Sequence, residues 1–109
     1  MKSPDAVLAQ FERRLVAWNA RVRAPNIDRA LPARDLKVIE ALLPADVHGR
    51  RGVKLWDAFS NYVAAVSSWL DGREAAGAND AEWLPVLEEG VDDAWEDCEK
   101  ALADPLVKR

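Results

Sequence analysis

The chain has 109 residues, the length of one domain, and its 50% hydrophobic and 31% charged residues are typical of a folded globular protein. No apolar run approaches the roughly 18 residues that a membrane-spanning helix needs, so a membrane protein is not expected. The single cysteine, Cys98, excludes an internal disulfide, and the first residues form no apolar signal region. Both features favour a cytoplasmic protein.

Charge is unevenly distributed along the chain, although the formal net charge is only −4. Residues 1–54 carry 11 Lys and Arg against 6 Asp and Glu, a net charge of +5. Residues 55–109 carry 4 against 13, a net charge of −9. Such an asymmetry either holds the two halves against each other or directs one half to a charged partner.

The first two predicted helices are bounded by prolines. Ser3 is a good N-cap before Pro4, and Pro25 ends the first helix. The apolar seam of this helix is Leu8, Phe11, Leu15, Trp18 and Val22. A shorter helix follows, with Pro32 in its first turn and Pro44 as its stop. Its apolar face is Leu36, Ile39, Leu42 and Leu43.

The third predicted helix runs from about Val53 to beyond Leu70 and carries a wide apolar stripe. One row of the stripe is Leu55, Phe59, Tyr62, Val66 and Trp69, and a second row is Trp56, Val63 and Leu70. This width is expected of a helix with two neighbours, and it makes the helix the candidate surface for a homodimer. Gly72 either ends the helix or weakens it.

The fourth predicted helix begins near Asp80 or, in the favoured interpretation, near Pro85, because proline disrupts a helix beyond its first turn. Its inward face is Leu87, Val91, Ala94, Trp95, Cys98, Ala101 and Leu102. Gly90 is interpreted as the site of a close backbone approach, and residues 104–109 are interpreted as a frayed tail.

These four segments show helical spacing and no sustained β-alternation, so they predict an all-α fold. We expect a small antiparallel helical bundle of three long helices and one short helix, in a single domain over residues 1–109. Residues in the middle of the apolar seams should be buried, namely Leu15, Phe59, Val66 and Val91. Four of the five tryptophans fall on or beside these seams and are expected in the core: Trp18, Trp56, Trp69 and Trp95.

The outer face of the fourth helix concentrates negative charge. Seven acidic residues lie within twelve positions: Glu88, Glu89, Asp92, Asp93, Glu96, Asp97 and Glu99. They form four like-charge pairs at spacing i,i+4, and each pair opposes helix formation by roughly 0.2–0.5 kcal/mol. Three interpretations of this face are open. It is a solvated surface screened by arginines of the N-terminal half, or a docking face for a basic protein, or a carboxylate cluster that binds a metal.

Trp83 precedes the acidic helix and either staples its start or lies exposed beside the acidic face. An exposed aromatic residue next to acidic ones is typical of a protein-binding hot spot. We therefore expect a non-enzymatic protein-binding module, of the inhibitor or immunity type. It would dock Trp83 and the acids Glu88, Glu89, Asp92, Asp93, Glu96 and Asp97 on a basic, nucleic-acid-binding surface of a partner.

Two alternatives remain open, a structural or oligomerising bundle and a small metal-dependent nucleotide hydrolase. The hydrolase has weak support because Glu89-x-x-Asp92 and Glu96-x-x-Glu99 share one helix and face outward. No metal, cofactor or catalytic residue is expected, and Cys98 lies on the apolar seam. The loop from His48 to Lys54 is interpreted as a basic loop or, alternatively, a phosphate-binding loop.

Direct nucleic-acid binding is not expected, although four arginines are predicted on the outer side of the first helix: Arg13, Arg14, Arg21 and Arg23. The chain as a whole is acidic, and it contains no DNA-binding motif.

Overall fold

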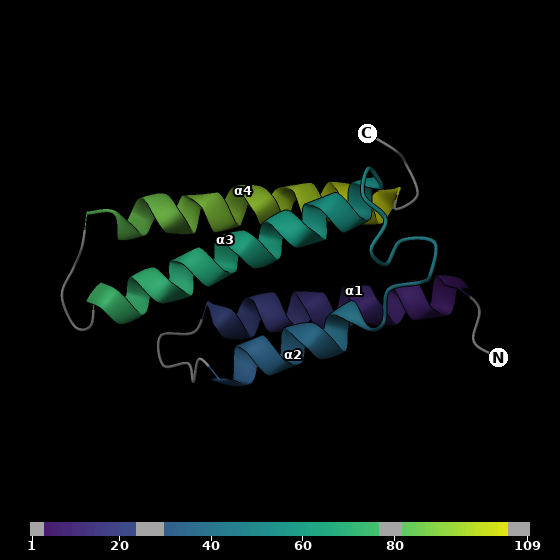
Figure 1. The fold of residues 1–109 in the computed structure, drawn as a ribbon, viewed down its shortest axis with the longest axis horizontal. Coiled ribbons are helices and arrows are strands. Elements are labelled where there is room, and N and C mark those ends of the chain that lie inside the picture. Colours follow the sequence, from purple (N-terminus) through teal and green to yellow (C-terminus); the bar gives the residue numbers. More distant parts are fainter. Residues whose placement is uncertain (1–3, 24–29, 77–81, 105–109) are drawn as a thin grey trace. The chain divides into compact units, whose positions relative to one another are not determined.

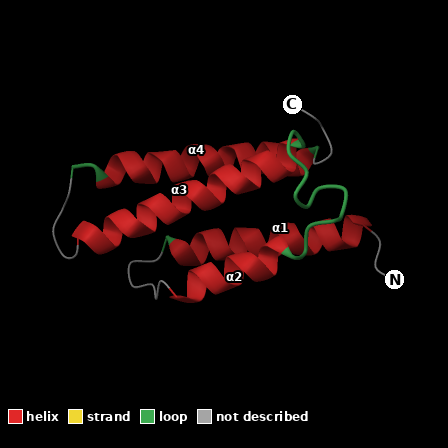
Figure 2. Ribbon diagram, in the orientation of Figure 1, coloured by secondary structure: helices red, strands yellow, loops and turns green. Residues whose placement is uncertain are grey.

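The computed structural model describes residues 4–23, 30–76 and 82–104, and within these ranges the chain is helical and contains no β-strand. The helices in these ranges are α1 (Pro4–Val22), α2 (Ala30–Glu40), α3 (Lys54–Ala76) and α4 (Leu84–Ala103) (Figures 1 and 2). The predicted all-α fold class, with three long helices and one short helix, is confirmed. None of these helices is long and apolar enough to cross a membrane.

The chain divides into two compact units. Met1–Gly49 contains α1 and α2, and Arg50–Arg109 contains α3 and α4. Within each unit the two helices run antiparallel, as a helical hairpin (Figure 1). The expectation of a single domain over residues 1–109 stays a prediction.

In the first unit, the seam predicted for α1 is confirmed from Phe11 to Val22, whereas Leu8 is half-buried. The buried residues of this seam are Phe11, Leu15, Trp18 and Val22, and those of α2 are Ile39 and Leu43. An ion pair joins the two helices, with Nη1 of Arg21 2.8 Å from Oδ2 of Asp35. The predicted N-cap Ser3 lies outside the described residues, as do residues 105–109 of the predicted tail.

The end of α2 lies four residues before the proline that was predicted to stop it. Regular helix ends at Glu40, and the next turn is closed by tighter bonds from the Leu42 N–H to the Ile39 carbonyl and from the Leu43 N–H to the Glu40 carbonyl, both 3.0 Å. Pro44 explains this tightening, because a proline ring clashes with the carbonyl four residues before it and the preceding residue avoids helical geometry.

The segment between α2 and α3 is a loop, as predicted, and two of its glycines need their conformational freedom. Gly49 and Gly52 have φ angles of 72° and 86°, which other residues rarely adopt. The loop also supplies the core with Val47 and Val53, which are 1% and 5% exposed. Sequence analysis did not predict the burial of Val47, because an isolated valine in a loop has no periodic pattern.

In the second unit, the two rows of α3 differ in burial. The first row is buried, namely Leu55, Phe59, Tyr62, Val66 and Trp69. The second row, Trp56, Val63 and Leu70, is half-buried. Tyr62 contacts Trp95 of α4, with ring centroids 5.4 Å apart. The homodimer through α3 stays a prediction, and within the described ranges the exposed large hydrophobic side chains lie on other elements.

The predicted burial of the mid-seam residues is confirmed, since Leu15, Val66 and Val91 are 0% exposed and Phe59 is 2% exposed. Of the four tryptophans predicted in the core, Trp18 and Trp69 are buried, whereas Trp56 and Trp95 are half-buried. Both of these side chains therefore remain partly exposed to solvent.

We predict that Phe59→Ala lowers the free energy of unfolding by about 3–5 kcal/mol, because it removes a buried ring and leaves a cavity. Val16→Ala is the control, because Val16 is 49% exposed. Its effect should be below about 1 kcal/mol in urea melts. Equal effects of the two substitutions would contradict the burial of Phe59.

Candidate functional site

The rotation of α4 about its own axis is set by its buried residues. These are Val91, Ala94, Cys98 and Ala101, spaced by three or four residues along one face. With about 100° of rotation per residue, the acidic positions between them must point away from that face. All seven predicted acids are exposed: Glu88, Glu89, Asp92, Asp93, Glu96, Asp97 and Glu99. We call these seven residues the acidic face.

Glu96 of the acidic face forms an ion pair with Lys100. Oε1 of Glu96 is 3.3 Å from Nζ of Lys100, one turn further on, and both side chains are more than 60% exposed. A pair this exposed contributes at most a few tenths of a kcal/mol. Glu89, Asp93 and Asp97 follow one another at spacing i,i+4 and have no ion-pair partner among the described residues. Their mutual repulsion is therefore not relieved by a neighbouring cation in that part of the chain.

An exposed apolar patch lies at the start of α4. Trp83 is the N-cap residue and is 45% exposed, and Val86 is 66% exposed. Val86 lies on the same side of the helix as Glu89, Asp93 and Asp97, which follow it by three, seven and eleven residues. The patch and the acidic face therefore form one continuous surface.

Trp83 combines the two roles that the sequence left open. One edge of its ring packs on α3, where a Cβ at Gly72 would lie 2.7 Å from Cζ3 of Trp83 and 2.6 Å from Cδ1 of Leu87. The rest of the ring is exposed to solvent. α3 continues past Gly72 to Ala76, so this glycine does not end the helix; it makes room for the start of α4.

The predicted close approach at Gly90 is wrong. A Cβ at this position would meet nothing within 4 Å, and Gly90 is exposed on the outer side of α4. The close approach is at Gly72 instead. Sequence analysis could not distinguish the two glycines, because both interrupt a helical pattern and their neighbours come from another helix.

Cys98 is a buried thiol with no sign of reactivity. Burial, and to a lesser extent the charges of Asp97 and Glu99, raises the pKa of Cys98 from 9.0 to about 12. The thiol is therefore protonated at neutral pH, and a thiolate nucleophile is not formed. This agrees with its predicted place on the apolar seam.

The structure gives little support to the other two candidate sites, the metal site and the phosphate-binding loop. Within the described ranges, no group of three or more His, Cys, Asp and Glu side chains is placed to hold a metal ion. In the loop proposed for phosphate, the Gly52 N–H donates to Oδ1 of Asp57 at 3.3 Å, so a carboxylate of the chain occupies a donor that an anion would use. His48 Nε2 lies 4.0 Å from Oε1 of Glu40.

Two features of the surface were missed by sequence analysis. Val86 was not singled out, although its offset of three from Glu89 could have placed it next to the acidic face. Arg14 and Arg21 were assigned to the outer side of α1, yet both line a surface hollow between α1 and α2. Arg23 is half-buried and is not on the outer side.

Comparison with known proteins assigns the chain to no family: no protein-family model, no curated protein and no solved structure matches it.

We predict opposite outcomes for alanine at the two glycines within helices. Gly90→Ala should raise the free energy of unfolding by about 0.5–1 kcal/mol, because alanine favours the helix and the space is open. Gly72→Ala gains the same propensity but forces Trp83 and Leu87 apart from α3, a penalty of about 1–3 kcal/mol. Urea melts should therefore place Gly72→Ala about 1–3 kcal/mol below Gly90→Ala. Equal stability of the two variants would contradict the packing of Trp83 on Gly72.

We predict a second, pH-dependent effect from Cys98. The pKa of Cys98 is higher in the folded chain than in the unfolded chain. The buried thiol therefore contributes fully to the free energy of unfolding below pH 9, and this contribution is lost as the pH rises toward 12. The free energy of unfolding should fall by up to about 1.4 kcal/mol per pH unit, the value for release of one proton on unfolding. This fall should be absent from Cys98→Ser. Equal slopes in urea melts of both proteins between pH 8.5 and 10.5 would contradict the raised pKa.

Proposed function

We propose that this protein is a non-enzymatic binding module that docks the acidic face of α4, together with Trp83 and Val86, on a basic surface of another protein. The observation that carries this proposal is the row of Glu89, Asp93 and Asp97, exposed and without a cation of the described chain beside it, continuous with an exposed apolar patch. Self-repulsion on a helix is a loss of stability that a basic partner would reverse.

The two parts of this surface have different roles in docking. The carboxylates accelerate encounter with a basic partner and fix its orientation, and each exposed charge at a rim adds at most about 1 kcal/mol of affinity, so several of them must act together. The half-exposed indole of Trp83 and the side chain of Val86 supply the apolar area that anchors a complex. A functional interface would need both, because charge alone is screened at physiological salt.

The charge density of the acidic face favours a partner that binds nucleic acid. The seven acids span twelve residues, Glu88 to Glu99, which is about 16 Å at 1.5 Å per residue. This corresponds to about one carboxylate per 2.4 Å of helix axis, compared with about one phosphate per 1.7 Å along duplex DNA. A protein surface built to neutralise phosphates would therefore accept this face. An inhibitor or immunity-type protein that occupies a nucleic-acid-binding cleft fits this chemistry.

We predict that the triple variant Glu89→Gln, Asp93→Asn and Asp97→Asn is more stable than the wild type but loses its partner. Two like-charge pairs disappear, so the free energy of unfolding should rise by about 0.4–1 kcal/mol at low salt. Glu96 is left in place because it pairs with Lys100. Affinity purification from nuclease-treated extract of the source cells should recover the partner at least about tenfold less with the variant than with the wild type.

The matched control removes three charges elsewhere, by Glu12→Gln, Asp46→Asn and Asp104→Asn, all at exposed positions. This control should recover the same partner as the wild type. The proposal is contradicted if the wild type recovers no protein with a basic nucleic-acid-binding surface, or if the triple variant recovers it equally well.

A further inference from the structure

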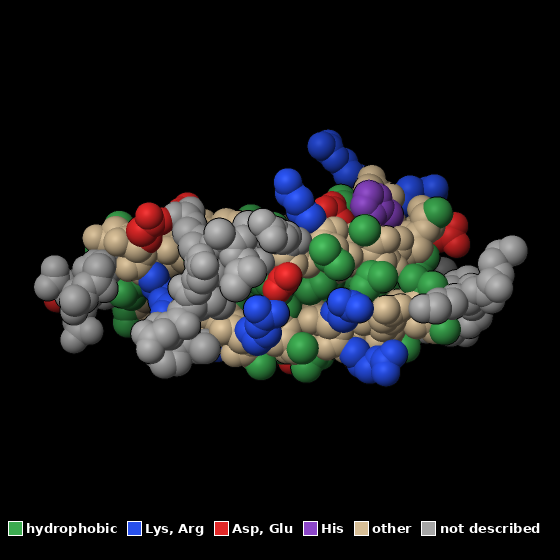
Figure 3. Space-filling model, turned by 90° about the horizontal axis from the view of Figure 1, so that it is seen from below, with side chains coloured by type: hydrophobic (Ala, Val, Ile, Leu, Met, Phe, Trp, Pro, Cys, Tyr) green, Lys and Arg blue, Asp and Glu red, His purple; other side chains and the backbone are tan. Residues whose placement is uncertain are grey.

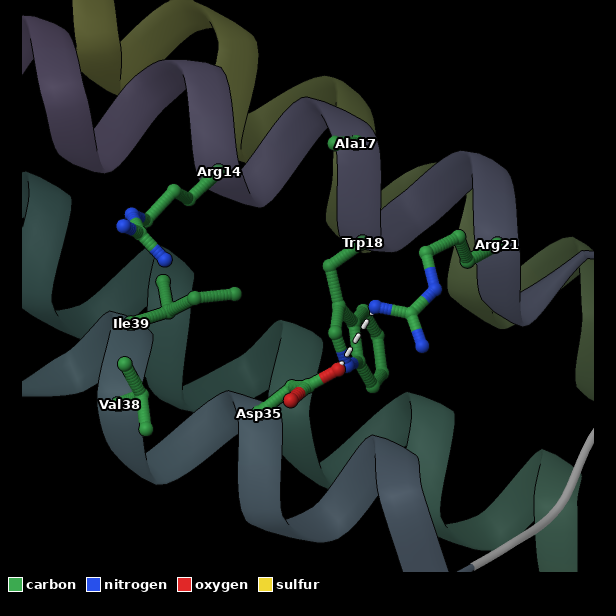
Figure 4. Close-up of a pocket in the computed structure, with 7 residues that line it drawn as sticks. All are labelled: Arg14, Ala17, Trp18, Arg21, Asp35, Val38 and Ile39. Carbon is green, nitrogen blue, oxygen red and sulfur yellow. Dashed lines mark hydrogen bonds and ion pairs between the residues drawn. The ribbon is translucent and has the colours of Figure 1, made fainter.

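A surface hollow of about 170 Å³ lies between α1 and α2, within the first unit (Figure 4). Arg14 and Arg21 project from α1 toward α2 on either side of Ala17 and Trp18 (Figure 4). One face of the molecule shows Lys and Arg side chains among exposed hydrophobic ones (Figure 3). The hollow therefore combines cationic groups with an apolar lining, and the acidic face of α4 does not contribute to it.

The two arginines of the hollow differ in their electrostatic state. Arg21 is paired with Asp35 at 2.8 Å, which neutralises that end. Arg14 is exposed and has no ion-pair partner among the described residues, and its guanidinium lies toward Ile39 (Figure 4). The hollow thus offers one available positive charge, at the end opposite the ion pair.

The side chains between the two ends are apolar: Ala17 and Trp18 on α1, with Val38 and Ile39 on α2. Trp18 and Ile39 are each only 3% exposed, so Ala17 and Val38 supply most of the apolar surface that a ligand can reach. Val38 is 50% exposed although it is a large aliphatic residue. A ligand with an apolar body would cover Val38 and remove this surface from water.

We propose that this hollow binds a small carboxylate with an apolar or aromatic body, about the size of benzoate. A cavity of about 150 Å³ holds one benzene ring, so the volume suits a single ring with its carboxylate at the Arg14 end. The Arg14 guanidinium binds the carboxylate through two parallel N–H donors, a geometry that a planar, singly charged group matches. This site is independent of the function proposed for α4.

The same features disfavour other anions. A phosphate dianion carries a second charge, which Asp35 would repel and which the apolar lining cannot solvate. Acetate has the charge but lacks a body to fill the lining. A neutral aromatic amide has the body but lacks the charge that pairs with Arg14. Recognition therefore requires charge and apolar body together.

The test is a titration of the ¹⁵N-labelled protein with sodium benzoate, followed by two-dimensional NMR, with benzamide and inorganic phosphate as comparison ligands. Benzoate should shift the Trp18 indole N–H and the Ile39 amide signals saturably, with a dissociation constant on the order of 1 mM. Benzamide and phosphate should bind at least about tenfold more weakly. Shifts that do not saturate, or equal binding of benzamide, would overturn the proposal.

Two neighbouring arginines provide a matched pair of variants. Arg14→Gln removes the charge from the hollow, whereas Arg13→Gln removes an exposed charge one position away that does not line it. Both positions are exposed, so both variants should fold, which circular dichroism checks. Arg14→Gln should weaken benzoate binding at least about tenfold, and Arg13→Gln should change it less than about twofold. Equal loss in both variants would show a general charge effect and overturn the site.

Discussion

The packing of α3 against α4 fixes which way α4 faces, and the candidate docking surface follows from that rotation. Tyr62 of α3 lies against Trp95 of α4, with centroids 5.4 Å apart, and the buried side chains of Val91 and Cys98 occupy the same inward sector. A helix held in this way has no freedom to turn its carboxylates toward the apolar seam. Any sequence change that rotates α4 would bury charge, at a desolvation cost far larger than the repulsion it relieved.

The start of α4 depends on the same packing. Leu84 begins the helix with Pro85 in its second position, where no intrahelical N–H bond is lost, and Trp83 stands at the N-cap without a side-chain hydrogen bond. The contact with Gly72 replaces that bond as the constraint on Trp83. Because only part of the indole packs on Gly72, the rest is held in a defined position at the edge of the acidic face. A pre-positioned aromatic anchor loses less conformational entropy when a partner binds.

Within the acidic face, the row of Glu89, Asp93 and Asp97 breaks a local rule of helix stability, and no ion pair to a described residue compensates it. Burial follows the apolar seam on the inward side of α4, whereas Glu89, Asp93 and Asp97 repel one another on the outward side. Proteins that violate such rules at exposed positions usually do so for function. Gly90 adds to this pattern, since it lowers helix stability on the outward side and no neighbour requires it.

Sequence periodicity predicted the helices and their inward faces well, because burial of an apolar seam dominates the energy of each helix. The spacing of Phe11, Leu15 and Trp18 was enough to predict their burial, and the chemistry of Pro85 was enough to predict where α4 begins. Exposure of the acidic face followed from the same periodicity.

Features that depend on contacts between elements were not predictable in this way. The roles of Gly72 and Gly90 depend on which helix lies opposite, and the burial of Val47 depends on how a loop returns to the core. The availability of Arg14 in the hollow depends on which residues of α2 lie opposite α1. Asp35 lies opposite Arg21 and pairs with it, whereas no acidic residue of the lining pairs with Arg14. Pairing of this kind is set by the register between two helices, which the sequence of one helix does not contain.

The most direct measurement of the central claim is the salt dependence of unfolding of the wild-type protein, followed by urea melts at neutral pH. Raising NaCl from about 0.01 M to about 0.5 M shortens the screening length from about 30 Å to below the roughly 6 Å that separates side chains at i,i+4. If the acidic face repels itself in the free protein, the free energy of unfolding should rise by about 0.5–1 kcal/mol. A decrease would show that cations of the same chain already neutralise the face, and would contradict the view that it is kept for a partner.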